Sequence, residues 1–319
     1  MGLFTSKKNP CPFCGGPTPR LLATTIEGTP ICGTCKDKID LPDGTVNLSL
    51  EDARQYLAYY DANKPLRDSF SATFKYNCGE WNDLIQIDVP QRLFRIRDKG
   101  DSLVMESSCL TAFRILEDNT VLFESSPEGL KWYETDTPAR VKAVEPEIDR
   151  YHADMDRYMQ AKRMNEMIED MEKRGDFSRG SPTPFISEPI FSVDTPIKKF
   201  YVELTLDHPY WGGVRTLDNN APDWGVLSPS YIDFMRKYEK ETGLLHTLAT
   251  SLMSVIDPDA PEEEHILLPA PAAVAAAPAA ESRSVADPVA EIQKYKALLD
   301  SGALTEEEFA AKKRQLLGI

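Results

Sequence analysis

The amino-acid sequence predicts an α+β fold built from several parts. These are a small four-cysteine zinc module, an antiparallel β-sheet or barrel domain with long helices, a disordered Ala/Pro linker and a C-terminal α-helical hairpin. Three observations predict this organisation. Two C-x2-C pairs lie close together near the N-terminus, and short strand-like segments recur in the middle of the chain at spacings of about 8–12 residues. The run PAPAAVAAAPAA then separates this middle part from a short region with helical periodicity.

The composition excludes several classes of function. The chain has 319 residues with 36 Lys and Arg against 51 Asp and Glu, which gives a formal net charge of −15. Phosphate contacts need a basic face, so the charge argues against a protein that binds nucleic acid along its whole length. No apolar run reaches the roughly 18 residues of a membrane span, and no basic start followed by an apolar stretch indicates a secretion signal. We therefore expect a cytoplasmic protein, with peripheral attachment to a membrane surface as the alternative.

The strongest chemical motif is the set of four cysteines at the N-terminus. They follow the pattern C-x2-C-x17-C-x2-C, which is typical of a zinc site with four thiolate ligands. The alternatives are two disulfides or a redox dithiol. Disulfides fit poorly without a secretion signal, and a redox C-x-x-C normally occurs once, beside a βαβ pattern. The pattern predicts one structural Zn2+, because four protein ligands leave no open coordination position. The predicted ligands are Cys11, Cys14, Cys32 and Cys35.

Glycines beside these cysteines support the zinc interpretation. Gly15 and Gly16 follow the first pair and Gly33 lies inside the second, and glycine tolerates the positive-φ turns that aim backbone N–H groups at the sulfurs. The two other cysteines, Cys78 and Cys109, have no evident basic neighbour that would lower the pKa, so we expect them to be ordinary, largely buried residues.

The N-terminal parts follow from local sequence. Residues 1–10 are expected to be a flexible tail; Met1-Gly2 with Ser6 also fits the short N-myristoylation pattern. The zinc module is assigned to residues 11–41, with a strand over Leu21–Ile26, a turn at Glu27-Gly28 and a short helix from Cys35 to Ile39. A module of this size needs its metal to fold.

A β-domain with long helices is predicted over residues 49–256. It begins with a helix over 49–62, for which Ser49 and Asp52 provide a loose capping box. Short alternating or apolar segments then predict an antiparallel sheet or barrel. The predicted strands are Leu84–Asp88, Leu93–Arg97, Ser102–Glu106, Ala112–Leu116, Val121–Glu124 and Arg140–Val144.

A long helix is predicted over Glu145–Arg174, so that residues 145–175 form a helical insertion. Its Met and Tyr stripe has two interpretations: a groove for a partner, or the core-facing side of an ordinary helix, which we favour. The proline-rich residues 175–189 are expected to form a linker. Strands are then expected at Ile190–Val193 and Phe200–Leu206, and a second long helix at Tyr231–Val255.

The segment DHPYWGG, residues 207–213, is the densest cluster of unusual residues in the chain. One interpretation is an enzyme centred on Asp207 and His208, which would need a nucleophile or metal partner. The alternative that we favour is a turn at a strand end, with two aromatic rings packing back on the sheet. His152, His246 and His265 are the remaining histidines, and none lies near this segment in sequence.

The C-terminal part consists of a tether and a hairpin. Residues 257–288 are expected to be a disordered linker, because their Ala/Pro-rich composition cannot form a packed core. Residues 289–319 predict two helices separated at Gly302, the second capped by Thr305 with Glu308 three residues later. Two such short helices bury too little surface to be stable alone, so we expect them to pair with another copy or to dock elsewhere.

Three segments resemble known families. IQKYKALLDSGALTEEEFAAKKRQLLGI resembles the short C-terminal domain called SHOCT, which implies an oligomerisation or tethering module without catalytic residues. CPFCGG…EGTPICGTCKDKI resembles a family of uncharacterised bacterial zinc-binding domains. LIQIDVPQRLFRIRDKG, with FYVELTLDHPYW and the helix Tyr231–Val255, is similar in order to bacterial pleckstrin-homology-like (PH-like) domains. This last resemblance implies binding of protein or lipid, and the insertion 145–175 departs from that pattern.

These features together predict a non-enzymatic adaptor or scaffold. It would bind an unknown protein partner through the zinc and β modules and self-associate or dock through residues 289–319 as a homo-oligomer or in a larger assembly. The first alternative is a peripheral membrane or lipid sensor that uses the PH-like domain. Its basic groups would be Lys7, Lys8, Arg92, Arg95 and Arg97, although the last three also fit the solvated face of a strand. The second alternative is the enzyme centred on Asp207 and His208.

Overall fold

The fold was analysed in a computed structural model of the chain. The structure describes residues 10–19, 22–42, 48–78, 83–96, 101–175, 187–225, 228–261 and 264–267. The chain divides into two units, Met1–Leu268 and Pro269–Ile319, and the second unit lies outside the described residues. The predicted hairpin 289–319, most of the tether, the tail residues 1–9 and Arg97 also lie outside them. Within the described ranges, no helix is both long enough and apolar enough to cross a membrane.

The N-terminal part contains a two-stranded ribbon followed by three helices. The strands β1 (Thr25–Ile26) and β2 (Thr29–Pro30) pair on either side of the predicted turn. The helices are α1 (Gly33–Lys38), α2 (Leu50–Ala62) and α3 (Lys64–Ser69). The predicted cap of α2 is confirmed as a full capping box, since Ser49 and Asp52 each accept a hydrogen bond from the other's backbone N–H.

In the part of the chain that the structure describes, ten further strands form two sheets. The first is antiparallel with the order β3-β4-β5-β6, where the strands are β3 (Phe74–Cys78), β4 (Asp83–Asp88), β5 (Leu93–Ile96) and β6 (Met105–Glu106). The second has the order β11-β10-β7-β8-β9-β12. Its strands are β7 (Leu110–Glu117), β8 (Thr120–Ser126), β9 (Gly129–Glu134), β10 (Lys199–Leu206), β11 (Gly213–Asn220) and β12 (Glu264–Leu267). All its pairs are antiparallel except β12 with β9.

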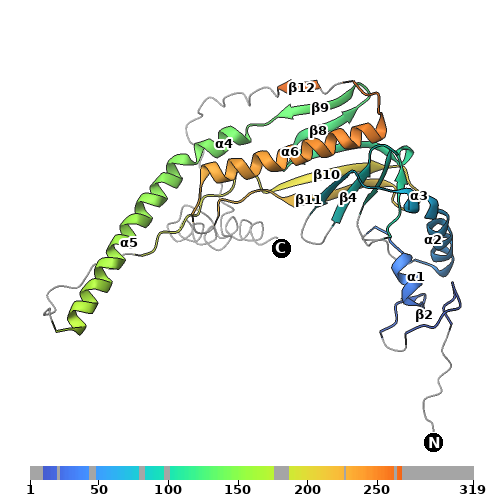
Figure 1. The fold of residues 1–319 in the computed structure, drawn as a ribbon, viewed down its shortest axis with the longest axis horizontal. Helices are drawn as coiled ribbons and strands as arrows, with labels where there is room; N and C mark the ends of the chain where they lie inside the picture. The colour runs from blue at the N-terminus through green and yellow to red at the C-terminus, as the bar shows by residue number, and fades with distance from the viewer. Residues whose placement is uncertain are drawn as a thin grey trace, which may run out of the picture. The chain divides into compact units, whose positions relative to one another are not determined.

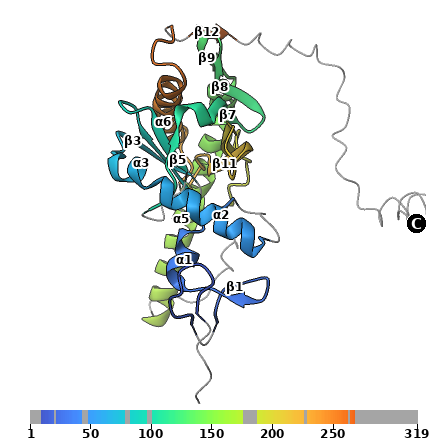
Figure 2. The same cartoon turned by 90° about the vertical axis from the view of Figure 1, so that its right-hand side faces the viewer.

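The helix α6 (Tyr231–Ile256) lies between the two sheets (Figure 2). It contacts β7, β8 and β9 of the six-stranded sheet and β3 of the four-stranded sheet. Its apolar stripe is fully buried at Leu245, Leu248 and Leu252, because these positions recur at helical spacing on one face. This helix therefore joins the two sheets into one core, and neither sheet closes into the barrel that the PH-like resemblance implies.

Two helices are inserted between β9 and β10, where the sequence predicts an insertion. They are α4 (Thr137–Ala143) and α5 (Glu145–Lys173), and Figure 1 shows α5 continuing away from the sheets. Only Ile148 and Tyr151 of α5 are buried. Among the later residues of the predicted stripe, Met164 is 53% exposed, and the half-buried ones are Met155, Tyr158, Ile168 and Met171. The stripe therefore packs fully on its own domain only at the start of α5.

The structure corrects three further expectations. Residues 140–144, predicted as a strand, belong mainly to α4, because Pro138 favours the first turn of a helix. Ile190–Val193 forms no strand; Pro189 cannot donate to a ladder and Pro196 follows closely. The segment 257–288 begins with ordered residues, since β12 pairs with β9 inside the range assigned to the tether. The strands β3, β9 and β11 had not been predicted.

Candidate metal centre

The four cysteines of the N-terminal motif gather at one point. The sulfur atoms of Cys11, Cys14, Cys32 and Cys35 all lie within 4.8 Å of one another, and the Sγ atoms of Cys14 and Cys32 are 3.4 Å apart. Tetrahedral ligands at about 2.3 Å from an ion are separated from each other by roughly 3.8 Å. The geometry and the thiol donors therefore fit one bound metal ion. Among the described residues this is the only such group of potential ligands.

The backbone around the first pair has the shape of a metal-binding knuckle. The amide N–H of Cys11 donates to the carbonyl of Gly16 at 2.8 Å, and the N–H of Gly15 donates to the carbonyl of Cys11 at 2.9 Å. Gly15 has a φ of 72°, which favours glycine. A Cβ on Gly16 would lie 3.2 Å from the Cys14 sulfur. The expected positive φ is thus found at Gly15 but at neither Gly16 nor Gly33.

The second pair is positioned by α1. Cys32 is the N-cap residue of this helix, and the N–H of Cys35 donates to its sulfur at 3.4 Å. The carbonyl of Cys32 accepts from the N–H of Lys36 at 3.0 Å, which is an ordinary first helical bond. Gly33 is simply the first residue of α1. The hydrogen bond from the N–H of Cys35 lowers the pKa of the Cys32 thiol, but burial and the neighbouring thiols of Cys14 and Cys11 raise it, and the net pKa is raised.

Burial and hydrogen bonding set the ionisation of the thiols. Cys11, Cys32 and Cys35 are buried, whereas Cys14 is exposed. Burial raises the pKa of Cys11, but hydrogen bonds from the backbone of Cys32, Phe13 and Cys14 lower it, and the net result is a pKa of about 6. Burial raises the pKa of Cys35. At neutral pH the cluster therefore holds at least one thiol that ionises readily, which is the form that binds metal.

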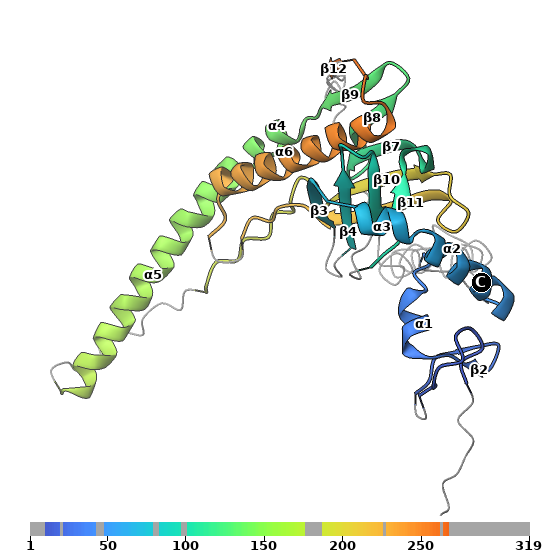
Figure 3. The same ribbon diagram turned by 45° about the vertical axis from the view of Figure 1, so that its right-hand side comes forward.

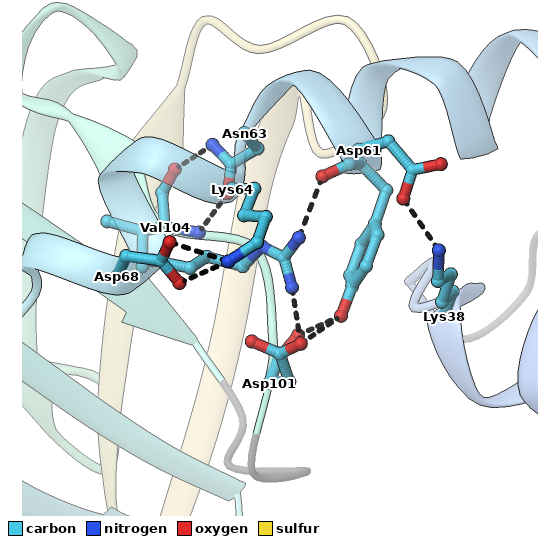
Figure 4. Close-up of polar contacts among 9 residues, drawn as sticks. Lys38, Asp61, Asn63, Lys64, Asp68, Asp101 and Val104 are labelled. Carbon is cyan, nitrogen blue, oxygen red and sulfur yellow. Dashed lines mark hydrogen bonds and ion pairs between the residues drawn. The ribbon is translucent and has the colours of Figure 1, made fainter.

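A small apolar cluster surrounds the sulfurs. It consists of three of the cysteines with Ile26, Ile31, Ala53 and Leu57. Ala53 and Leu57 belong to α2, so the cysteine module is packed directly against this helix. Two polar links lie at the C-terminal end of α2 (Figure 4). Lys38 forms an ion pair with Asp61 at 2.6 Å. The side chain of Asn63, the C-cap residue, donates to the carbonyl of Val104 at 2.8 Å and accepts from the N–H of Val104 at 3.1 Å.

Asp40 forms the junction between the module and the β-domain. Its carbonyl accepts a hydrogen bond from the Tyr56 hydroxyl at 2.8 Å and from the indole Nε1 of Trp211 at 3.1 Å. Its N–H donates to the same Tyr56 oxygen at 3.2 Å. The sequence motif locates the cysteines but gives no sign of this junction, because a backbone carbonyl is common to every residue and its partners lie far away in sequence.

The DHPYWGG segment supplies Trp211 to this junction and packs its other aromatic rings beside it. His208 is 5% exposed, and its Nδ1 accepts from the backbone N–H groups of Tyr210 at 3.2 Å and Trp211 at 3.0 Å. The ring proton therefore lies on Nε2, which donates to the Tyr59 hydroxyl at 3.0 Å. Tyr210 packs edge-on against Tyr56 and Tyr59. Burial lowers the pKa of His208, and Asp207 is exposed beside it. The segment has the geometry of the turn with packed aromatics.

The two described residues among the basic groups considered for lipid binding, Arg92 and Arg95, have partners inside the protein. The guanidinium of Arg92 donates to the carbonyls of Val255 at 3.0 Å and Ile256 at 2.6 Å, at the end of α6. Arg95 donates to Gln86 Oε1 at 2.6 Å and lies over the ring of Phe70. Lys7, Lys8 and Arg97 lie outside the described residues. Of the other two cysteines, Cys78 is buried and Cys109 half-buried, and burial raises the pKa of Cys109.

Comparison with known proteins identifies one part of the chain. Residues 290–317 match the family model described as SHOCT, short C-terminal domain. No curated protein matches the chain, and no solved structure matches it. The matched segment lies outside the described residues, and it agrees with the resemblance seen in the sequence. The comparisons provide no support for a PH-like domain in the middle of the chain.

Proposed function

We propose that the chain is a non-enzymatic adaptor or scaffold. The cysteine module and the β-domain would bind a protein partner, and residues 289–319 would self-associate or dock to a larger assembly. The ion held by the four cysteines would be Zn2+, because soft thiolate ligands in a four-coordinate site favour zinc.

The observation that carries the proposal is the donor set itself. Four protein sulfurs supply all the ligands of a tetrahedral ion, so no coordination position remains for a water molecule or a substrate. A zinc ion held in this way stabilises a fold. The cluster is also packed on α2 and joined to the β-domain through Asp40, which favours one continuous recognition surface over an independent metal domain.

The match of residues 290–317 to SHOCT supports the second half of the proposal. About 30 residues bury too little apolar surface to fold stably without a partner. A long tether joining this segment to the rest of the chain raises the effective concentration of linked sites into the mM range at best. A partner bound by the first part would thereby be held close to whatever the second part binds.

Metal content tests the structural role of the cysteines. Purified chain should hold one zinc equivalent by native mass spectrometry, and Cys11→Ser should lose it. Because such small modules depend on their metal, the variant should also expose the N-terminal amides to hydrogen exchange. Cys109→Ser is the matched control, since Cys109 lies outside the cluster. Unchanged exchange in metal-free Cys11→Ser would contradict a structural role.

The adaptor role is tested by tagged purification from the source cells. Full-length chain is compared with a version that ends at Ala286, and bound proteins are identified by mass spectrometry. Partners that require the tail would support docking through residues 289–319, whereas partners common to both versions would assign recognition to the cysteine and β modules. Recovery of no partner by either version would contradict the adaptor proposal.

The lipid-sensor alternative has less support. Arg92 and Arg95, two of its five nominated basic residues, make hydrogen bonds within the protein. An anionic lipid would have to compete with the carbonyls of α6 for Arg92. Liposome pelleting with phosphatidylserine vesicles is the direct test, and pelleting by the wild type that is lost in Arg95→Glu would restore this alternative.

A further inference from the structure

A pocket of about 480 Å³ lies between α6 and the strands β8 and β9, on the opposite part of the β-domain from the cysteine module. Figure 1 shows these elements side by side, with β12 next to β9. Its walls include Phe123 and Trp132 from the sheet and Tyr238 and His246 from the helix. A volume of roughly 300–1,000 Å³ is usual for a site that binds a small molecule.

Aromatic rings form one wall of the pocket. Phe123 and Trp132 are direct neighbours across β8 and β9, and their rings are stacked with centroids 6.4 Å apart. His265 of β12 lies opposite Trp132 in the parallel pairing, and its ring stacks on the indole at 4.3 Å. Phe123 and His265 thus flank the two faces of the indole, and Phe123 is itself buried. The wall therefore offers a bound molecule apolar area, and any preference for charge must come from other groups of the pocket.

The charged groups of the pocket have the same sign. Glu134 and Glu239 line it, and no Lys or Arg is found among the described residues that do. The Glu117 side chain lies behind the wall, where the Tyr238 hydroxyl donates to it at 2.7 Å, and because burial raises the pKa of this carboxyl it is not counted among the charges of the pocket. Two histidines, His246 and His265, also line the pocket, and His265 Nε2 is 3.8 Å from Glu134. The pocket is therefore electronegative as well as aromatic.

A glycine in the helix keeps the pocket open. Gly243 lies in the middle of the 26-residue α6 and lines the pocket. Glycine destabilises a helix interior relative to alanine, and a packed neighbour usually explains its presence there. A Cβ at Gly243 would meet no protein atom within 4 Å. Packing in the described protein therefore does not require this glycine, and a side chain larger than alanine at this position would extend into the space of the pocket.

We infer that this pocket binds a small organic cation, with an ammonium group attached to an aromatic or apolar body. The aromatic wall contacts the body of the molecule, and the carboxylates of Glu134 and Glu239 attract and balance the positive charge. A neutral aromatic molecule would gain the apolar contacts alone. An anion would meet two carboxylates without a basic partner.

Isothermal titration calorimetry on the full chain tests the inference with phenethylammonium, benzyltrimethylammonium and 2-phenylethanol. Phenethylammonium and 2-phenylethanol share the same phenethyl body and differ in charge. We expect both ammonium compounds to bind about tenfold more tightly than the alcohol. Equal binding of the amine and the alcohol, or no binding of either ammonium compound, would overturn the inference.

Two variants assign the binding to this pocket. Glu239→Gln should weaken phenethylammonium several-fold and leave 2-phenylethanol unchanged, whereas Glu166→Gln on α5, remote from the pocket, should change neither. Gly243→Leu should abolish binding without lowering the unfolding midpoint, because leucine fills the pocket and is a better helix former. Gly243→Ala should fold and retain binding. Undiminished binding in Gly243→Leu or in Glu239→Gln would place the cation elsewhere and contradict the assignment.

Discussion

The indole Nε1 of Trp211 donates a hydrogen bond to the backbone carbonyl of Asp40 at 3.1 Å, across 171 residues of chain. Asp40 follows α1, the helix that contains Cys35, and Trp211 lies in the loop between β10 and β11. The Tyr56 hydroxyl donates to the same carbonyl. The exit of the cysteine module is therefore held by α2, the next helix along the chain (Figure 3), and by the loop between β10 and β11 of the six-stranded sheet, which is remote in sequence.

Replacement of this indole should loosen the module. Trp211→Phe retains most of the buried ring but removes the donor, and we expect a loss of about 1–2 kcal/mol in the free energy of unfolding. The cysteine thiols should then react faster with a thiol reagent in the presence of a chelator. Trp224→Phe is the matched control, because Trp224 donates to Asp194 at 3.3 Å, away from the cysteines. Equal thiol reactivity in the two variants would show that Trp211 does not hold the module.

The parts of the fold that the sequence predicts are those with local signals. The helices 49–62, 145–174 and 231–255 are confirmed to within a residue or two, because periodicity and caps act within a few turns. The strand Phe200–Leu206 is confirmed by strict alternation of buried residues. In contrast, β11 reads GVRTLDNN, with few apolar residues, and its pairing with β10 comes from the tertiary fold.

The candidate metal centre likewise contains residues that a sequence pattern predicts and residues that no pattern predicts. The four cysteines were predicted from spacing alone, and their sulfurs do converge. Tyr56 and Trp211 could not be assigned to the site, since a hydrogen bond to a backbone carbonyl leaves no pattern in sequence. The pocket between α6 and the strands β8 and β9 could not be predicted from sequence either, because Trp132 and Gly243 come together only when α6 packs on the sheet.

The buried imidazole of His208 should make stability fall in weak acid. Burial lowers the native pKa below its ordinary value of 6.5, so below that pH the unfolded chain takes up a proton that the native state does not. The stabilisation is therefore complete above about pH 6.5 and is lost as the pH falls toward the native pKa. His208→Asn can still accept from the two backbone N–H groups but does not titrate. Urea unfolding at pH 7.5 and 5.5 should show a smaller loss in the variant.

The comparison of the wild type with His208→Asn also separates the contribution of His208 to the loss of stability in acid from that of the cysteine thiols. Metal affinity also falls in acid because thiolates are protonated, and this contribution is common to the wild type and His208→Asn. The difference between the two proteins thus reports the histidine alone. Equal losses of stability in both would mean that His208 is protonated without cost in the fold.

Arg92 should contribute to the stability of α6. Its guanidinium donates to the last carbonyls of the helix, at Val255 and Ile256, which otherwise have no intrahelical partner. Arg92→Met removes two charge-assisted hydrogen bonds and a cation at the negative end of the helix dipole, so we expect a loss of about 2 kcal/mol by denaturant unfolding. Arg236→Met is the control, because Arg236 is largely exposed and should cost close to nothing. A comparable loss in both variants would show that the contacts at the helix end add no stability.

Glu117 should change stability with pH in the direction opposite to His208. Burial raises the pKa of this carboxyl, although the hydroxyls of Thr137 and Tyr238 donate to it and lower the pKa in part. Above its ordinary value of 4.5 the unfolded chain loses the proton first, so stability declines as the pH rises through the native pKa. The slope is at most about 1.4 kcal/mol per pH unit for one proton.

Glu117→Gln tests this sign, because the amide keeps the shape of the side chain and carries no charge. Unfolding free energies measured from pH 4.5 to 8 should decline less in the variant than in the wild type, and Glu166→Gln should follow the wild type. Parallel curves for Glu117→Gln and the wild type would mean that the carboxylate is charged in the native state. In that case the surrounding hydroxyl donors would compensate the cost of burial in full, and the pocket beside Tyr238 would carry a third negative charge toward its ligand.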